Sequence, residues 1–331
     1  MSEYLPIDSS SLRTDTVVGC DIYLLVKTTA EVRFVLYCKG DAIFEESKKE
    51  ILVAKKIKSL FVKKEDQQKY FDYLENTFRD IVLLDTEIPL DEKTKIVHSA
   101  ATNLVKDLFS DPRASNIQRT KTFAYNMVDY ILKEGNAAES LLKIAVHGYH
   151  TYTHSVNVAA VGTLFAKNIG LGENDLKQLC SGILLHDLGK TKISTDILNK
   201  KGKLTKEEFQ IIKTHPVLGA AILKETGRDL KDECIITLQH HENFDGTGYP
   251  YGLKKDEIHP SGKIARIIDV YDALTTNRPY AEAVRPFNAL FEMKEKMLNC
   301  FDKEMFVEFI RFLGSHDPRG KPPRKKDKIY N

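Results

Sequence analysis

The spacing of apolar residues changes near residue 85, and this change predicts two different kinds of structure. Residues 16–27 and 31–38 are rich in Val, Ile, Tyr, Leu and Phe, and the short link between them predicts a hairpin. A helix at 45–57, a third strand at 59–64 and a second helix at 65–82 complete this part. We therefore expect a small α+β domain over residues 1–85, with a regulatory or docking role and no chemistry of its own.

Apolar residues recur at helical spacing from residue 91 onward. One helix spans 91–108, the next is predicted at 123–132, and nearly every periodic segment up to residue 313 is helical. The sequence therefore predicts a multidomain chain in which the α+β domain precedes an all-α domain. The expected parts are residues 1–85, a helical linker and start of the helical domain at 86–142, the catalytic domain at 143–313, and a basic, disordered tail at 314–331.

Composition narrows the class of protein without naming an activity. The chain has 331 residues, 42% of them apolar and 29% charged, which is typical of a soluble globular protein. The net charge of +2 gives no sign of a nucleic-acid partner, and no apolar run is long enough to span a membrane. Five scattered cysteines without a CxxC pair indicate a reducing cytoplasm and no thiolate zinc site.

The apolar stripe at residues 176–184 predicts a buried helix that ends in His186 and Asp187. Gly189 follows where a helix can end in a left-handed turn, and Lys190 lies four residues after His186. Burial of the His-Asp pair is costly unless something pairs with it. A metal cation would do so, and the alternative is a pair satisfied by hydrogen bonds alone.

Further histidines and carboxylates stand at predicted helix ends and junctions. His215 precedes a proline at a helix junction, which is a good place to aim a side chain. Imidazole and carboxylate groups without thiolate suit iron, manganese or zinc. Seven such ligands are too many for one four-coordinate ion, and they suit two metals that share a bridging carboxylate in phosphoryl chemistry. The candidate ligands are His154, His186, Asp187, His215, His240, His241 and Asp269.

The order of these motifs resembles the HD-GYP family of HD-domain metal-dependent phosphohydrolases. The resemblance covers residues 143–288, and its most specific part is the HHExxDGxGYP string at 240–250. It implies an all-helical HD fold and hydrolysis of the bacterial second messenger cyclic di-GMP.

The resemblance also implies a role for each matching residue. One metal would be held by His154, His186 and Asp269, the other by His215, His240 and His241, with Asp187 bridging them. Asp187 and Lys190 would be catalytic, with Lys190 at the scissile phosphate or the nucleophile. Asp272 would contact substrate or a group behind the ligands, and Arg278 would bind phosphate. The loop Gly248-Tyr249-Pro250 would shape the site mouth or contact a partner.

Two positions depart from the family pattern. His150 stands where some members have a glutamate ligand, so it is a candidate for an additional metal ligand or an ordinary helix-end residue. Ala281 replaces a basic residue that would contact phosphate. We expect two metal ions, iron or alternatively manganese, and a third only if His150 binds one.

The sequence thus predicts a dinuclear phosphodiesterase that hydrolyses cyclic di-GMP to pGpG, GMP or both. One alternative is a catalytically weak cyclic di-GMP receptor that docks diguanylate cyclases (GGDEF proteins) through the Tyr249 loop. Another is an HD hydrolase of a different nucleotide. A homodimer is a further candidate assembly.

Overall fold

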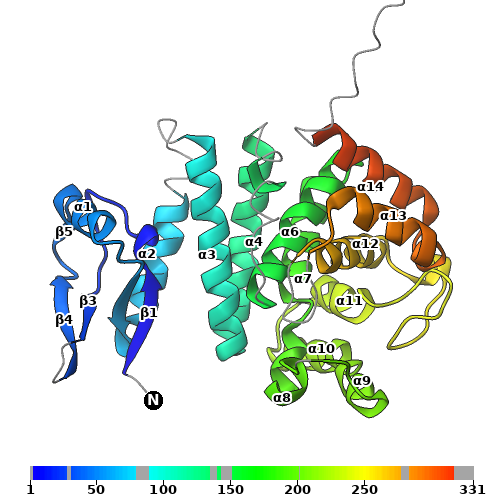
Figure 1. The fold of residues 1–331 in the computed structure, drawn as a ribbon, viewed down its shortest axis with the longest axis horizontal. Helices are drawn as coiled ribbons and strands as arrows, with labels where there is room; N and C mark the ends of the chain where they lie inside the picture. The colour runs from blue at the N-terminus through cyan, green and yellow to red at the C-terminus, as the bar shows by residue number, and fades with distance from the viewer. Residues whose placement is uncertain are drawn as a thin grey trace, which may run out of the picture. The chain divides into compact units, whose positions relative to one another are not determined.

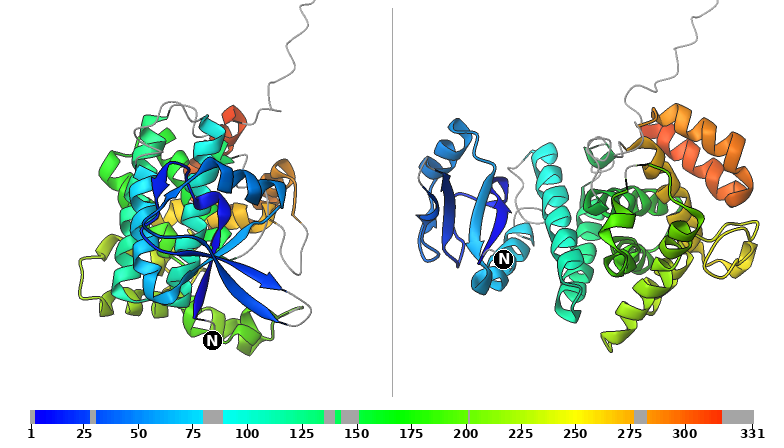
Figure 2. Two further views of the ribbon diagram at one scale, coloured as in Figure 1. Left: turned by 90° about the vertical axis from the view of Figure 1, so that its left-hand side faces the viewer. Right: turned by 60° about the horizontal axis from the view of Figure 1, so that its bottom comes forward.

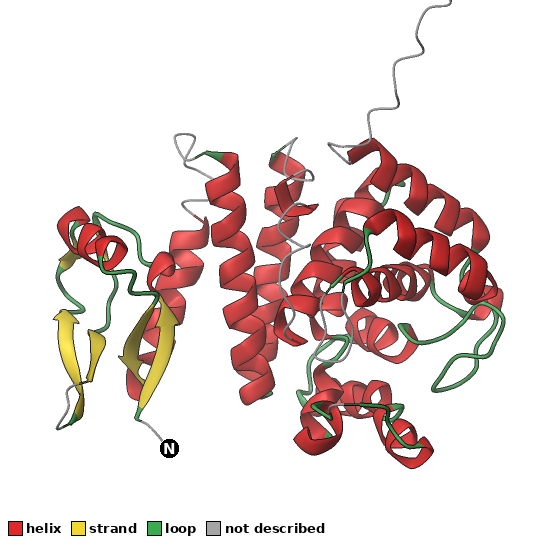
Figure 3. Cartoon of the chain, in the orientation of Figure 1, coloured by secondary structure: helices red, strands yellow, loops and turns green. Residues whose placement is uncertain are grey.

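The structure, a computed structural model, describes residues 3–27, 31–79, 89–134, 140–142, 151–200, 202–276 and 283–316. Two compact units divide the chain, Met1–Ala100 and Ala101–Asn331. As Figure 3 shows, the named strands of the described chain lie in the first unit, and the second is helical. The predicted fold class, a small α+β region followed by a mostly helical region, is confirmed. The four expected domain boundaries stay a prediction.

A twisted four-stranded sheet organises the first unit (Figure 2, left). Its order is β1-β6-β3-β4, and every pairing is antiparallel. The residues Leu60 and Val62 alternate with more exposed ones along β6, and both are buried in one core with Tyr70 and Phe71 of α2. The elements are β1 (Tyr4–Asp8), β2 (Thr16–Val17), β3 (Ile22–Lys27), β4 (Val32–Cys38), β5 (Ile43–Phe44), α1 (Glu46–Ala54), β6 (Ser59–Lys63) and α2 (Gln67–Arg79).

The sequence did not predict three strands of this unit, β1, β2 and β5, as separate elements. The expected strand at 16–27 is divided into β2 and β3, because Gly19 between them has a φ of +81° that an extended strand does not adopt. The strand β5 is only two residues long and pairs with β2. The strand β1 contains Pro6, which argues against a central strand, and β1 accordingly lies at an edge of the sheet.

The helix α7 (Glu173–Leu185) is the centre of the second unit. It packs against α4, α6 and α11, and it is buried nearly all round, which exceeds the single stripe predicted from the sequence. Figure 1 labels these helices. The division between the units falls within α3 (Leu90–Ser110). The other helices of the second unit are α4 (Ala114–Lys133), α6 (Thr151–Asn168), α8 (Thr195–Leu198), α9 (Lys206–Ile212), α10 (His215–Glu225), α11 (Lys231–Gln239), α12 (Pro260–Thr275), α13 (Pro286–Met297) and α14 (Lys303–His316).

The helix α4 begins nine residues before the predicted start at residue 123. Its first turns bury the polar residues Asn116, Arg119 and Thr120, so they lack the apolar periodicity by which a buried helix is recognised. Of the helices that the structure describes, none has the length and apolar character needed to cross a membrane.

Candidate metal centre

The end of α7 carries His186 and Asp187 into the interior, where both are at most 2% exposed. A short 3-10 turn, Leu188–Lys192, follows directly. Gly189 does not adopt the left-handed conformation predicted for it. Instead, a side chain at Gly189 would overlap the backbone of His215 and Gly219 in α10. The glycine is therefore needed for close approach, which brings the start of α10 against the His-Asp segment.

Three of the histidines are oriented by the same local bond. In each, the ring Nδ1 lies within hydrogen-bond distance of a backbone carbonyl three residues earlier, and Nδ1–H is the donor that this contact requires. The ring is thereby held with its Nε2 lone pair toward the other histidines, as metal-binding histidines usually are. The bonds join His186 to Ile183 O (2.5 Å), His215 to Ile212 O (2.8 Å) and His240 to Thr237 O (2.8 Å).

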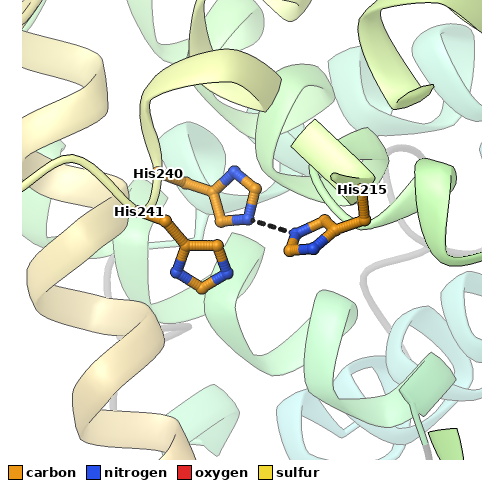
Figure 4. Close-up of side chains that lie close together, drawn as sticks. All are labelled: His215, His240 and His241. Atoms are coloured by element: carbon orange, nitrogen blue, oxygen red, sulfur yellow. Dashed lines mark hydrogen bonds between the residues drawn. The ribbon is translucent and has the colours of Figure 1, made fainter. Parts of the chain in front are cut away.

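This orientation creates a conflict between His215 and His240 that a cation resolves. Their Nε2 atoms lie 3.0 Å apart (Figure 4), and with both Nδ1 protons donated to carbonyls each Nε2 presents a lone pair to the other. Burial lowers the pKa of His215 to about 4 and that of His240 well below its ordinary value, so neither ring carries a second proton near neutral pH. His241 lies beside them, and the three rings form one group of potential ligands.

A second group of ligands forms around His154, near the start of α6. Its Nε2 lies 3.1 Å from Asp269 Oδ1, and its Nδ1 lies 2.6 Å from Asp272 Oδ2. With His186, the residues His154 and Asp269 form another group whose ligand atoms all lie within 4.8 Å of one another. Burial alone would lower the pKa of His154, but hydrogen bonds to Asp269 and Asp272 raise it to about 9. The Nε2 proton of His154 thus occupies the place that a metal cation would take.

Asp187 lies between the two groups and faces each with a different oxygen. Its Oδ2 is 3.4 Å from His186 Nε2 and 4.0 Å from His154 Nε2. Its Oδ1 is 3.3 Å from His215 Nε2 and 3.8 Å from His240 Nε2. One carboxylate can therefore serve both groups, which is the geometry that a bridging ligand requires.

The buried polar atoms at this centre fit a metal better than a hydrogen-bonded cluster. His186 Nε2 and Asp187 Oδ1 are fully buried and have no hydrogen-bond partner among the described residues, which is costly unless a cation completes them. Burial would raise the pKa of Asp187, yet His186, Lys190 and the other histidines hold it well below its ordinary value. With the exception of His154, the imidazoles around the ionised carboxylate are therefore neutral, which is the protonation state in which these groups bind metal.

Lys190 contacts the centre through its side chain. Its Nζ lies 2.5 Å from Asp187 Oδ2, and its side chain is 22% exposed. The helix ends at Leu185 and continues as a 3-10 turn, and within this turn the Lys190 ammonium pairs with Asp187. The ammonium group is therefore paired with Asp187, on a side chain that is partly exposed.

The loop after His241 is held by Glu242, whose role was not predicted. The Glu242 carboxylate is 1% exposed and accepts the backbone N–H groups of Tyr251 (2.7 Å) and Leu253 (3.0 Å). Tyr249 donates its own backbone N–H to His241 O (3.1 Å), and its ring stacks on that of His241 with centroids 4.7 Å apart. The position was visible in the HHExxDGxGYP string, but no sequence pattern shows that a glutamate there binds its own loop.

Several predicted positions cannot be placed. The residues His150, Arg278 and Ala281 lie outside the described residues, as does the tail from residue 317 onward. The structure brings together the other predicted site residues of the second unit. These are His154, His186, Asp187, Lys190, His215, His240, His241, Asp269 and Asp272, with Tyr249 stacked against His241.

The fold and this centre agree with the comparisons with known proteins. A family profile described as HD domain matches residues 139–305, so the chain belongs to the HD-domain family. The resemblance to the HD-GYP branch is also confirmed by relatives and a structural neighbour. Over 94% of this chain and 99% of the other, the fold is similar to that of Bd1817, an HDG"Y"P protein from Bdellovibrio bacteriovorus, with a TM-score of 0.69 and 20% sequence identity.

Three curated relatives are phosphodiesterases by name. Cyclic di-GMP phosphodiesterase PA4108 of Pseudomonas aeruginosa is 34% identical over 65% of this chain and 53% of its own length. The cyclic di-GMP phosphodiesterase response regulator RpfG of Xanthomonas campestris is 40% identical over 46% and 40%. The 3'3'-cGAMP-specific phosphodiesterase 3 of Vibrio cholerae is 35% identical over 50% and 35%. The chain thus spans about half or less of the length of these relatives.

Proposed function

We propose that this chain is a dinuclear metal-dependent phosphodiesterase that hydrolyses cyclic di-GMP. The observation that carries the proposal is Asp187, whose two oxygens face two separate groups of histidines. The names of the relatives PA4108 and RpfG support the substrate. Without the substrate named for these relatives, the geometry of the centre would support only the broader class of metal-dependent hydrolases.

The ligand groups define two metal positions. One would be held by His154, His186 and Asp269, and the other by His215, His240 and His241. Asp187 would bridge the two. Metal–ligand bonds of about 2.0–2.2 Å place ligand atoms about 3–4 Å apart around one ion, which the two groups reach with small movements of their side chains.

The ligand set favours iron, with manganese as the alternative. Five of the proposed ligands are imidazoles, Asp269 is a carboxylate at one metal, Asp187 is the bridging carboxylate, and none is a thiolate. A third ion would need His150, so two ions are the simplest assignment. Metal analysis of protein purified without oxygen measures both the identity and the number.

Two bound metals would lower the pKa of a shared water and so supply a nucleophile near neutral pH. Lys190, which is paired with Asp187 on a partly exposed side chain, would bind an oxygen of the scissile phosphate. Asp272 holds the His154 ring from behind through Nδ1. Arg278 remains a proposed phosphate ligand on the family resemblance.

The products and the choice of substrate need direct measurement. We expect cyclic di-GMP to be converted to pGpG, GMP or both, and the test is product chromatography with metal-loaded protein under reducing conditions. The panel includes 3'3'-cGAMP, because a relative is named for it, and nucleoside triphosphates. Turnover of cyclic di-GMP in preference to the others supports the proposal. Tight binding of cyclic di-GMP without turnover would favour the receptor alternative, in which the Tyr249 loop docks a diguanylate cyclase.

A further inference from the structure

Lys213 lies at the end of α9, two residues before the proposed metal ligand His215, which begins α10. Its Nζ atom lies 5.1 Å from the ring centroid of Phe209, one helical turn earlier, and 5.2 Å from that of Tyr249. The Tyr249 ring also stacks on the ring of His241, another proposed ligand. One aromatic ring therefore joins the ammonium group of Lys213 to the metal centre.

The charge of Lys213 has no negative partner among the described residues. No carboxylate of those residues forms an ion pair with it, and its ammonium group makes no hydrogen bond to them. A cation–π contact orients an ammonium group without placing a negative charge beside it. The residue is partly exposed. Lys213 therefore offers a positioned positive charge to an anionic ligand.

Two other cations at the centre are already paired with proposed metal ligands. Lys190 Nζ lies 2.5 Å from Asp187 Oδ2, and Arg266 Nη1 lies 4.0 Å from Asp269 Oδ2. The positive charge of each therefore balances a buried carboxylate. Lys213 differs from both because its contacts are with uncharged rings, so its charge is left for a bound molecule.

We propose that Lys213 binds the phosphate of the cyclic dinucleotide that is not cleaved. The inference rests on the proposed function and extends it to the choice of substrate. Cyclic di-GMP contains two phosphodiester groups in one small ring, and each carries a negative charge. The metals and Lys190 would engage the scissile group, so the other group needs a second cation nearby. A lysine ammonium is a common partner for a phosphate, and Lys213 lies one ring from the centre.

This contact would make Lys213 a determinant of substrate choice. A diester with a single phosphate places its only charge at the metals and gains nothing from Lys213. A cyclic dinucleotide gains a charge-assisted hydrogen bond, and the difference between the two affinities is the basis of specificity. The expected result is a preference for substrates that carry a second phosphate beside the scissile one.

A comparison of two substrates tests the contact in metal-loaded, full-length protein. Lys213→Met removes the ammonium group and keeps an apolar chain over the two rings. It should lower kcat/KM for cyclic di-GMP about ten-fold or more relative to kcat/KM for bis(p-nitrophenyl) phosphate, which has a single phosphate. The loss should lie mainly in KM, and Lys213→Arg, which keeps the charge, should recover most of it.

Lys206→Met is the matched control. Lys206 is the exposed first residue of the same helix, α9, so this variant removes an equal charge and should leave the ratio of the two rates as in the wild type. An equal loss on both substrates after Lys213→Met would overturn the inference, because Lys213 would then only support the fold of the centre.

Binding distinguishes a failure of this inference from a failure of the proposed function. Calorimetry with a slowly cleaved phosphorothioate analogue of cyclic di-GMP should give a Kd about ten-fold or more higher for Lys213→Met than for the wild type. Cleavage of cyclic di-GMP by the wild type with an equal Kd for the variant would contradict the inference alone. Binding that depends on Lys213 without cleavage would contradict the proposed function alone, and a wild type that neither binds nor cleaves would contradict both.

Discussion

Asp272 Oδ2 lies 2.6 Å from Nδ1 of His154, on a helix more than a hundred residues further along the chain. Nδ1–H donates in this bond, so Nε2 is left for a metal. Both residues are buried. The sequence assigned this carboxylate either to substrate or to a group behind the ligands. It therefore lies directly behind the proposed ligand His154, where such groups orient the ring and strengthen its binding.

We expect Asp272→Ala to weaken the metal position that contains His154 by about 10–100-fold. Asp272→Asn keeps an acceptor for Nδ1–H and should therefore lose less metal affinity than Asp272→Ala. The measurement is metal content at limiting metal, together with KM and kcat at saturating metal. A raised KM with unchanged metal affinity would instead place Asp272 at the substrate.

Gly189→Ala should destabilise the protein by about 3 kcal/mol or more, because the new methyl group overlaps the His215 backbone and α10 cannot keep its place. Gly314→Ala is the control. Gly314 lies in α14, where a side chain would meet no atom within 4 Å, so alanine should leave stability unchanged or raise it by up to about 1 kcal/mol. Urea unfolding of both variants decides the point, and equal stabilities would contradict it.

Glu242→Ala should release the loop that carries Tyr249 while leaving the metal ligands in place. The amides of Tyr251 and Leu253 lose their acceptor, so hydrogen exchange there should accelerate. The rate kcat/KM should fall while the metal content stays near that of the wild type. Glu242→Gln retains one acceptor oxygen and should be intermediate. Unchanged exchange at both amides would show that other contacts hold the loop.

The stability of the metal-free chain should fall as the pH drops below about 6.5. Burial lowers the pKa of His186, His215, His240 and His241 in the folded state, so between about 6.5 and the folded values the unfolded state binds more protons. Each such histidine costs about 1.4 kcal/mol per pH unit in that window. His154 acts oppositely, since its pKa is raised to about 9: it adds stability below about 6.5 that is lost as the pH rises through 9.

Thermal unfolding of metal-free protein at a series of pH values measures this slope. His215→Gln removes one group whose pKa is lowered to about 4, so its slope between pH 6 and 5 should be shallower than that of the wild type. Equal slopes would mean that His215 is not neutral in the folded metal-free chain.

Much of the centre could be predicted because its ligands are chemically distinctive and stand at helix ends. His215 was placed at a junction by Pro216 alone, and α10 does begin there. The helix α9 begins with a capping box of Thr205 and Glu208, and both of its hydrogen bonds are present. These features depend on residues close in sequence.

The features that the sequence did not predict depend on contacts between segments far apart in the chain. Gly189 was assigned a turn because glycine often ends a helix, whereas its reason is the backbone of His215. The strand β1 is stabilised by β6, over fifty residues later, and its own sequence interrupted by Pro6 is a poor strand. The polar first turns of α4 are buried by the surrounding helices and not by their own periodicity.

Metal content of the wild type and of Asp187→Asn, purified without oxygen, tests the central claim most directly. We predict two metal ions per chain in the wild type. The variant should retain fewer than one and lose cyclic di-GMP hydrolysis, because a neutral amide cannot bridge two cations. A folded Asp187→Asn protein with two ions per chain and full activity would contradict the account.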